Sequence, residues 1–199
     1  MAKLYFRYGA MNSGKSANLL MVAHNYESQN KPVLLLKPSK DTRWEAEHYI
    51  TSRALQDKAA AIPFMDENNL YQIINNHLKH HEIHAVLIDE AQFITEEHVL
   101  ELVQVVDELN IPVLCYGLKN RAAKGKLFVG SAALLYWADT IEELKNTCTY
   151  CNKKATQNLM LVDEIPEYHP QEVVMADIEG ELKIIPVCRM HYFHPTPTM

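Results

Sequence analysis

Four short apolar runs recur along the first two thirds of the chain, and each has the length of a buried strand. They span residues 4–8, 33–36, 85–88 and 113–116. Continuous apolar runs of this length are typical of strands covered on both faces, whereas a strand with one solvated face alternates apolar and polar positions. We therefore expect a central sheet packed on both sides.

Between these runs the apolar positions follow helical spacing, with one stripe each in residues 17–29, 70–78 and 95–109. The stripes are Leu19, Leu20, Val22, Ala23 and Tyr26, then Leu70, Ile73, Ile74 and Leu78, then Val99, Leu102, Val103, Val106 and Leu109. Thr95 is placed to begin the third helix, and the acidic residues Glu96 and Glu97 that follow it suit the first turn. Strands that alternate with helices predict an α/β fold, with a parallel sheet, helices on both faces and ligands at the carboxyl ends of the strands.

Residues 39–58 interrupt this rhythm with a polar and charged connection. A connection of this length is unusual within a compact domain and is often functional. Arg43 and Arg53 can reach phosphate groups from such a loop, although a solvated surface loop explains each arginine equally well.

The pattern of apolar and polar residues changes again at Lys145. Short segments rich in β-forming residues, at 158–162, 172–175 and 182–187, are separated by polar turns. They predict a small antiparallel unit, so we expect an α/β domain over residues 1–144 and a second domain over residues 145–199.

Composition excludes several classes of protein. The chain has 199 residues, of which 48% are hydrophobic and 22% charged, with a formal net charge of -6. The negative net charge argues against nucleic-acid binding as the main function of the protein. No apolar run approaches the roughly 20 residues that span a bilayer, and the start of the chain lacks a signal-peptide pattern. Four cysteines do not suggest a disulfide scaffold, so we expect a cytoplasmic protein without membrane or nucleic-acid partners.

The residues after the first apolar run read G-A-M-N-S-G-K-S, which fits the phosphate-loop pattern G-x-x-x-x-G-K-[ST]. They are Gly9, Ala10, Met11, Asn12, Ser13, Gly14, Lys15 and Ser16. A strand before and a helix after give the order in which loop N–H groups and the positive helix end face an anion. The alternative is a chance match in a glycine-containing turn. We expect a P-loop nucleotide-binding domain, with Lys15 on the β- and γ-phosphates and Ser16 on magnesium.

Two carboxylates, Asp89 and Glu90, directly follow the third apolar run. A carboxylate at this strand end can hold magnesium beside a phosphate loop. Glu90 can then orient a hydrolytic water or accept a proton from a substrate hydroxyl. The alternative is an exposed acidic turn.

Cys148 and Cys151 form a Cys-x-x-Cys pair, and Cys188 and His191 form a second pair after 36 intervening residues. Three thiolates and one imidazole make a closed tetrahedral zinc site, which predicts a structural metal rather than a catalytic one. A redox dithiol with an unrelated third cysteine is the alternative. His169 and His194 compete with His191 for the fourth position. The remaining cysteine, Cys115, reads as a small buried apolar residue.

The ordered motifs resemble the zinc-containing thymidine kinases of bacteria and animal cytosol over nearly the whole chain. They are G-A-M-N-S-G-K-S after the first strand, K-P-S-K-D-T-R-W after the second, L-I-D-E-A-Q-F after the third, Y-G-L after the fourth, L-F-V-G-S before Leu134 and Leu135, then E-L-K-N-T-C-T-Y-C and V-C-R-M-H-Y.

The resemblance implies ATP-dependent phosphorylation of the 5′-hydroxyl of thymidine, with deoxyuridine as a possible second substrate, in the salvage of DNA precursors. It implies Glu90 as the catalytic base and Ser16 and Asp89 as the magnesium positions, with Ala91 and Gln92 also near ATP. It places the nucleoside against Met11, Gln92, Phe93, Leu118 and Phe128. It also implies Mg²⁺ with ATP, a structural Zn²⁺, feedback inhibition by thymidine triphosphate, and a homotetramer.

Two departures from the family pattern concern the base. The segment from Gly117 to Gly125 reads G-L-K-N-R-A-A-K-G, where Ala123, or Ala122, replaces an aromatic residue. Ile184 stands where the family usually has a tyrosine. Lost stacking weakens or changes base preference, which leaves open a related nucleoside kinase with altered specificity. A non-catalytic ATP-binding regulatory protein is the third alternative.

Overall fold

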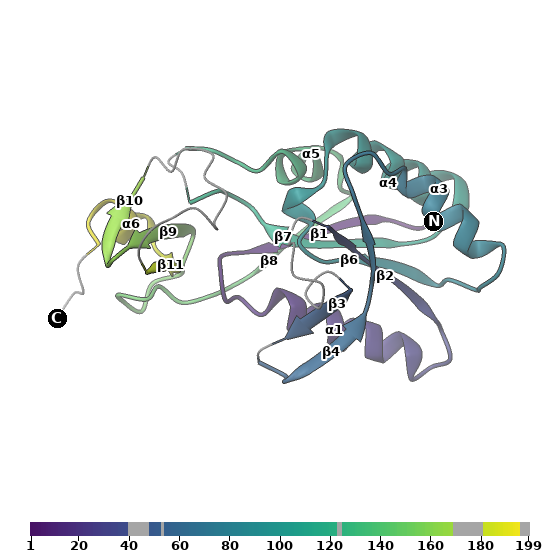
Figure 1. Cartoon of the computed structure of the whole chain (residues 1–199), viewed down its shortest axis with the longest axis horizontal. Coiled ribbons are helices and arrows are strands. Elements are labelled where there is room, and N and C mark those ends of the chain that lie inside the picture. The colour runs from purple at the N-terminus through teal and green to yellow at the C-terminus, as the bar shows by residue number, and fades with distance from the viewer. Residues whose placement is uncertain (40–47, 53, 123–124, 169–180, 196–199) are drawn as a thin grey trace.

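The computed structural model describes residues 1–39, 48–52, 54–122, 125–168 and 181–195. Its centre is a six-stranded parallel sheet in the order β5-β2-β6-β7-β1-β8. The four predicted strands form the middle of it, as β1 (Leu4–Gly9), β2 (Val33–Pro38), β6 (Ala85–Ile88) and β7 (Val113–Leu118). Helices cover both faces (Figure 1), so the predicted α/β class is confirmed.

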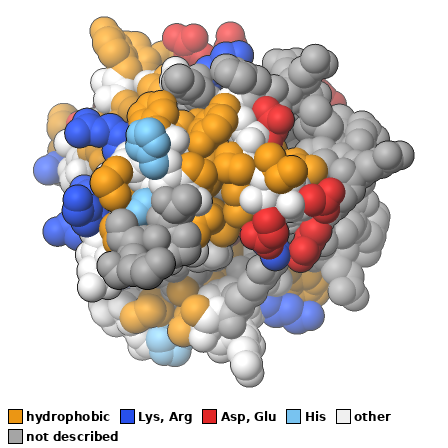
Figure 2. All heavy atoms as spheres, turned by 90° about the vertical axis from the view of Figure 1, so that its left-hand side faces the viewer, with side chains coloured by type: hydrophobic (Ala, Val, Ile, Leu, Met, Phe, Trp, Pro, Cys, Tyr) orange, Lys and Arg blue, Asp and Glu red, His pale blue; other side chains and the backbone are white. Residues whose placement is uncertain are grey.

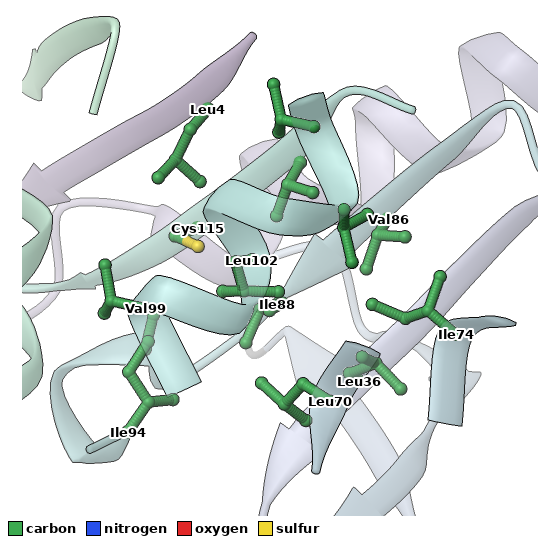
Figure 3. Packing of buried hydrophobic residues seen from close by; sticks show 14 of the residues in the cluster. Leu4, Leu36, Leu70, Ile74, Val86, Ile88, Ile94, Val99, Leu102 and Cys115 are labelled. Atoms are coloured by element: carbon green, nitrogen blue, oxygen red, sulfur yellow. The ribbon is translucent and has the colours of Figure 1, made fainter. Parts of the chain in front are cut away.

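The strands are apolar throughout because each feeds two cores. Alternate residues such as Leu36, Ile88 and Cys115 pack against α3 (Leu70–Leu78), α4 (Glu96–Leu109) and α5 (Val129–Trp137) on one face (Figure 3). The residues between them, such as Leu87 and Leu114, pack against α1 (Lys15–Glu27) on the other face. Period-two alternation between two buried faces explains the continuous apolar runs.

The predicted start of the third helix is confirmed. Thr95 caps α4 by accepting the His98 N–H at 3.1 Å, and His98 Nδ1 in turn faces the Thr95 N–H at 3.3 Å. Of the predicted stripe, Val99, Leu102 and Val106 are buried, while Val103 and Leu109 are partly buried. Val105 and His98 are also buried on this face. His98 is accommodated there because its Nε2 also lies 2.9 Å from the Asn68 carbonyl oxygen.

The two edge strands of the sheet were not predicted. They are β5 (Ile62–Phe64) and β8 (Thr140–Leu144). The residues predicted as a long loop also contain structure, an antiparallel pair of β3 (Tyr49–Ser52) and β4 (Asp57–Ala60) that contacts α1. The interpretation of 39–58 as one loop is therefore wrong for this part. Arg43 and Arg53 lie outside the described residues.

The C-terminal unit is antiparallel, as predicted. Its sheet has the order β10-β9-β11, formed by β9 (Gln157–Val162), β10 (Ile165–Glu167) and β11 (Leu182–Val187), and α6 (Arg189–Phe193) follows. The predicted segment 172–175 lies outside the described residues. The unit stands beside the main sheet (Figure 1). Figure 2 shows apolar side chains gathered on the face at this end, between basic and acidic groups.

Within the described ranges, every helix is too short or too polar to cross a membrane.

Candidate active site

The phosphate-loop motif lies between β1 and α1, at the carboxyl edge of the sheet. Gly14 is the N-cap of α1 with φ 76°, a left-handed conformation that costs glycine nothing. Gly9 is required for a different reason, because a Cβ there would lie 2.7 Å from the Leu144 carbonyl oxygen. The loop therefore brings its backbone and the positive end of α1 to one point, which suits an anion.

Lys15 begins α1 and folds back over this loop. Its Nζ donates to the Ala10 carbonyl oxygen at 2.9 Å. Burial lowers the pKa of Lys15, while the carboxylates of Glu90 and Asp89 oppose that shift. The ammonium group is therefore held beside the carboxylates that follow β6.

Ser16 and Asp89 meet although 73 positions separate them, because α1 begins at the edge of the sheet where β6 ends. The Ser16 hydroxyl donates to Asp89 Oδ2 at 2.8 Å. Asp89 is 4% exposed, and burial together with the Glu90 charge raises its pKa to about 6, against the opposing hydrogen bond from Ser16. A hydroxyl and a carboxylate oxygen side by side are the hard ligands that Mg²⁺ takes, so the pair fits that ion.

Glu90 stands in the left-handed region, with φ 52° and ψ 35°, and caps the short 3₁₀ turn η1 (Ala91–Phe93). Gln92, in that turn, is 2% exposed and donates its amide to the Glu90 carboxylate. The other end of the Gln92 amide accepts the Leu118 N–H at 3.0 Å. The orientation of the Glu90 side chain is thus set by a buried amide anchored on β7.

Gly117 makes room for this arrangement. A Cβ at Gly117 would lie 2.8 Å from Gln92 Oε1 and 2.9 Å from the Gln92 nitrogen. The Y-G-L motif at the end of β7 therefore has a steric reason, since only glycine lets η1 approach the strand so closely.

Two aromatic residues, which we call the aromatic wall, lie at the end of η1 and at the start of α5. Phe93 and Phe128 pack edge to face with their ring centroids 5.5 Å apart. Phe128 is the N-cap of α5, whose Ser131 hydroxyl donates to the Leu118 carbonyl oxygen at 2.5 Å. The structure thus brings together Gln92, Phe93, Leu118 and Phe128, the residues predicted for the nucleoside on this side of the site.

The segment that departs from the family pattern reaches the same wall. Arg121 places its guanidinium 5.4 Å from the centroid of the Phe128 ring. Ala122 accepts the Tyr192 hydroxyl at 2.8 Å through its carbonyl oxygen. Ala123 lies outside the described residues, and Ile184 lies on β11 opposite Met160.

Met11, predicted for both ATP and the nucleoside, is held by residues that the sequence did not single out. Its N–H donates to Asn158 Oδ1 at 2.8 Å, and its carbonyl oxygen accepts from Asn146 Nδ2 at 2.9 Å. A polar residue in the apolar strand 158–162 was the signal available for Asn158. Asn146 had no such signal.

The predicted metal residues form a cluster. One ligand atom from each of Cys148, Cys151, Cys188 and His191 lies within 4.8 Å of the others. His191 Nδ1 is 3.4 Å from the sulfurs of both Cys148 and Cys188, and the sulfurs of Cys151 and Cys188 are 3.9 Å apart.

This donor set fits a closed zinc site. All cysteines of the described residues are free thiols, which leaves them available as ligands. Burial opposes ionisation of Cys148, yet hydrogen bonds from the backbone of Cys188 and Tyr150 prevail and lower its pKa to about 6, and a thiolate is the form that binds metal. Of the two competing histidines, His194 is not in the cluster and His169 lies outside the described residues.

Comparison with known proteins agrees with this geometry. A family model described as thymidine kinase matches residues 2–192. A thymidine kinase of Enterococcus faecalis is 47% identical over 195 residues, which cover 98% of this chain and 96% of the relative. Thymidine kinases of Lactiplantibacillus plantarum and Lactococcus lactis are also 47% identical, with 97% and 99% of their lengths covered.

Proposed function

Because the chain belongs to the thymidine kinase family, we propose that it transfers the terminal phosphoryl group of ATP to the 5′-hydroxyl of thymidine. The observation that supports this most strongly is the position of Glu90. Its carboxylate is held by Gln92 next to Asp89, the partner of Ser16 at the end of the phosphate loop. A hydrolase needs a water there, whereas the aromatic wall beside Glu90 suits a nucleoside.

The triphosphate binds along the loop, where N–H groups and the positive end of α1 face its oxygens. Lys15 neutralises charge that develops between the β- and γ-phosphates during transfer. Asp89 and Ser16 would hold Mg²⁺, which supplies further charge neutralisation when bound. Asp89 is then ionised, since a nearby cation opposes the effect of burial on its pKa.

Glu90 acts as the general base. As the 5′-oxygen bonds to the γ-phosphorus, its proton passes to the Glu90 carboxylate and the bond to the β–γ bridging oxygen breaks, releasing ADP. The transition state for this transfer is loose, so correct positioning contributes more than the strength of the base. The bond from Gln92 supplies that positioning.

The base of the nucleoside packs against Phe93 and Phe128, with Leu118 and the Met11 side chain nearby. Deoxyuridine differs from thymidine by one methyl group and is a possible second substrate. The Cys148, Cys151, Cys188 and His191 cluster would hold a structural zinc, which supports a unit too small to form a large core. We place the domain boundary at residues 144 and 145, on the link between β8 and this unit.

The family resemblance extends the proposal to the whole protein. We propose a cytoplasmic homotetramer that thymidine triphosphate inhibits by feedback. Sedimentation velocity tests the tetramer, and inhibition curves against thymidine test the feedback.

A second candidate, a kinase for a related nucleoside, is favoured by Arg121 on the Phe128 ring. Arg121 belongs to the segment from Gly117 to Gly125 that lacks the aromatic residue of the family pattern, and lost stacking on the base weakens or changes base preference.

The experiment is a transfer assay with purified protein, Mg·ATP and a panel of nucleosides, read as 5′-monophosphate by chromatography. Thymidine should turn over fastest, with deoxyuridine second. Turnover of another nucleoside well above thymidine would establish the second candidate, and no transfer to any nucleoside would refute both.

A further inference from the structure

Two asparagines near the C-terminal unit bond to the phosphate loop at one residue. The Met11 N–H donates to Asn158 Oδ1 at 2.8 Å, and the Met11 carbonyl oxygen accepts from Asn146 Nδ2 at 2.9 Å. These asparagines lie 147 and 135 positions further along the chain. Both backbone polar groups of Met11 are therefore bonded outside the loop.

The surroundings of Asn158 determine the orientation of its amide. Its oxygen must face the Met11 N–H, which is a donor, and its Nδ2 donates to the Asn120 carbonyl oxygen at 3.2 Å. Asn158 is 1% exposed, so water competes little for these bonds. Asn120 is tied to the same strand again, through its Nδ2 and Gln157 Oε1 at 2.8 Å.

Both asparagines belong to the frame around the cysteine and histidine cluster. Asn158 is the second residue of β9, the central strand of its sheet, and the neighbouring β11 leads directly into Cys188. Asn146 precedes Cys148 by two residues, and its carbonyl oxygen accepts the Ala155 N–H at 2.8 Å. In Figure 1 the turn between β1 and α1 lies on the side of the main sheet that faces this unit.

The loop depends on this support because its conformation is costly. Asn12, next to Met11, has φ 56°, a left-handed conformation that persists in a non-glycine residue only where the surroundings enforce it. A phosphate loop works by aiming successive N–H groups at one anion, so a rotation at Met11 would redirect the donors that follow.

We propose that Asn158 and Asn146 are positioning residues for ATP, which hold the loop in its phosphate-binding conformation and make nucleotide affinity depend on the C-terminal unit. This rests on the proposed function, since it concerns the same ATP site. Neither side chain touches the nucleotide in this account. Both act through the backbone of Met11.

The test replaces each of the two asparagines that hold the backbone of Met11, which together we call the clamp. It measures nucleotide affinity separately from nucleoside affinity. Asn158→Leu keeps the branched shape of the side chain and removes both hydrogen bonds of the amide. Asn146→Ala removes the bond to the Met11 carbonyl oxygen from a half-buried position and serves if Asn158→Leu does not fold. Asn152→Ala, at an exposed asparagine of the same unit, is the matched control.

We expect Asn158→Leu to raise the KM for ATP by about 10–100-fold and Asn146→Ala by about 3–10-fold, as expected from lost hydrogen bonds to a buried backbone. The KM for thymidine should change by less than about threefold in either variant. Calorimetric titration with Mg·ADP should show the same loss of affinity, and Asn152→Ala should match the wild type.

If both variants have a lowered melting temperature but an unchanged affinity for Mg·ADP, the two asparagines only stabilise the contact between the units. That result would overturn the proposal. That outcome is distinct from failure of the proposed function, in which the wild-type protein itself would not phosphorylate a nucleoside. In that event Mg·ADP titration of the variants would still test the clamp.

Discussion

At the scale of single residues, the site concentrates groups that weaken the fold. Glu90 adopts a left-handed backbone conformation, Asp89 is a buried carboxylate, and Lys15 is a partly buried ammonium group whose pKa is lowered by loss of contact with water. Each costs stability in the absence of ligands. The motifs that carry these residues were readable from sequence because their chemistry is local. The positions of Gln92 against Leu118 and of Asn158 against Met11 join distant segments, so no local pattern could reveal them.

Asp89 offers a direct test of this cost. Its pKa in the folded protein, about 6, lies above the ordinary value of 3.8. The folded state therefore binds the proton more tightly, and the stability from that preference is complete below pH 3.8 and is lost as the pH rises through 6. Asp89→Asn, which imitates the protonated form, should stabilise the protein by about 1–3 kcal/mol at pH 7 without nucleotide.

The same substitution should abolish phosphoryl transfer, because a neutral amide holds magnesium poorly. Thermal unfolding at pH 5 and pH 7 checks the stability, and the gain should shrink at the lower pH. Asp107→Asn, at an exposed aspartate of α4, is the control. If Asp89→Asn lowers the free energy of unfolding at pH 7, the conclusion that the buried Asp89 carboxylate destabilises the ligand-free fold would be contradicted.

At the scale of elements, burial decided what could be predicted. The four central strands are packed on both faces and carry continuous apolar runs, so their positions and their helices followed from the pattern. The edge strand β8 contains Glu142 and Glu143 and has no fully buried residue, and β5 has three residues. β8 carries no continuous apolar run, and the apolar β5 contains Pro63, a residue that argues against a strand. The β3–β4 pair was missed for the same reason, because Ile50 and Ser52 are its buried members.

The contact between β7 and η1 gives an element-scale prediction. A methyl group at Gly117 would lie 2.9 Å from the Gln92 nitrogen, a backbone atom that cannot rotate away. Gly117→Ala should push η1 from the strand, misplace Glu90 and lower kcat by about 100-fold, the effect expected of an ångström-scale displacement at a reacting centre.

The affinity for Mg·ADP should fall much less, because the loop and Ser16 lie on other elements. Stopped-flow kinetics and calorimetry measure the two quantities. Gly125→Ala, at a glycine that has open space around its Cβ position but φ +70°, controls for the loss of a glycine as such. Unchanged kcat in Gly117→Ala would show that η1 does not position the base.

At the scale of the whole molecule, residues of the C-terminal unit contact the candidate active site of the α/β domain. The α/β domain supplies the loop and carboxylates, and the C-terminal unit fastens Met11 and the segment after β7 through Asn158 and Tyr192. The cluster of Cys148, Cys151, Cys188 and His191 lies in the C-terminal unit, whose apolar core is small. The antiparallel unit and the clustering of its three cysteines and one histidine were predictable from spacing, but the contacts of the unit with the loop were not.

Removal of the metal should therefore affect both units. Metal analysis should give about one zinc per chain in the wild type and none in Cys148→Ser. The variant should expose the C-terminal unit to protease, and its KM for ATP should rise because the clamp is lost. Cys115→Ala, at the buried cysteine of β7, should keep its metal. Retention of zinc by Cys148→Ser, or full resistance to protease without zinc, would contradict the assigned cluster.

The central claim is that the Glu90 carboxylate takes the proton of the attacking hydroxyl. The most direct measurement is the single-turnover rate of phosphoryl transfer to thymidine in Glu90→Gln, by rapid quench at saturating Mg·ATP, with Mg·ATP binding measured alongside. We predict a rate lower by about 100–10,000-fold, the usual range for a lost general base, with Mg·ATP affinity within about threefold of the wild type. A single-turnover rate close to that of the wild type would contradict the account.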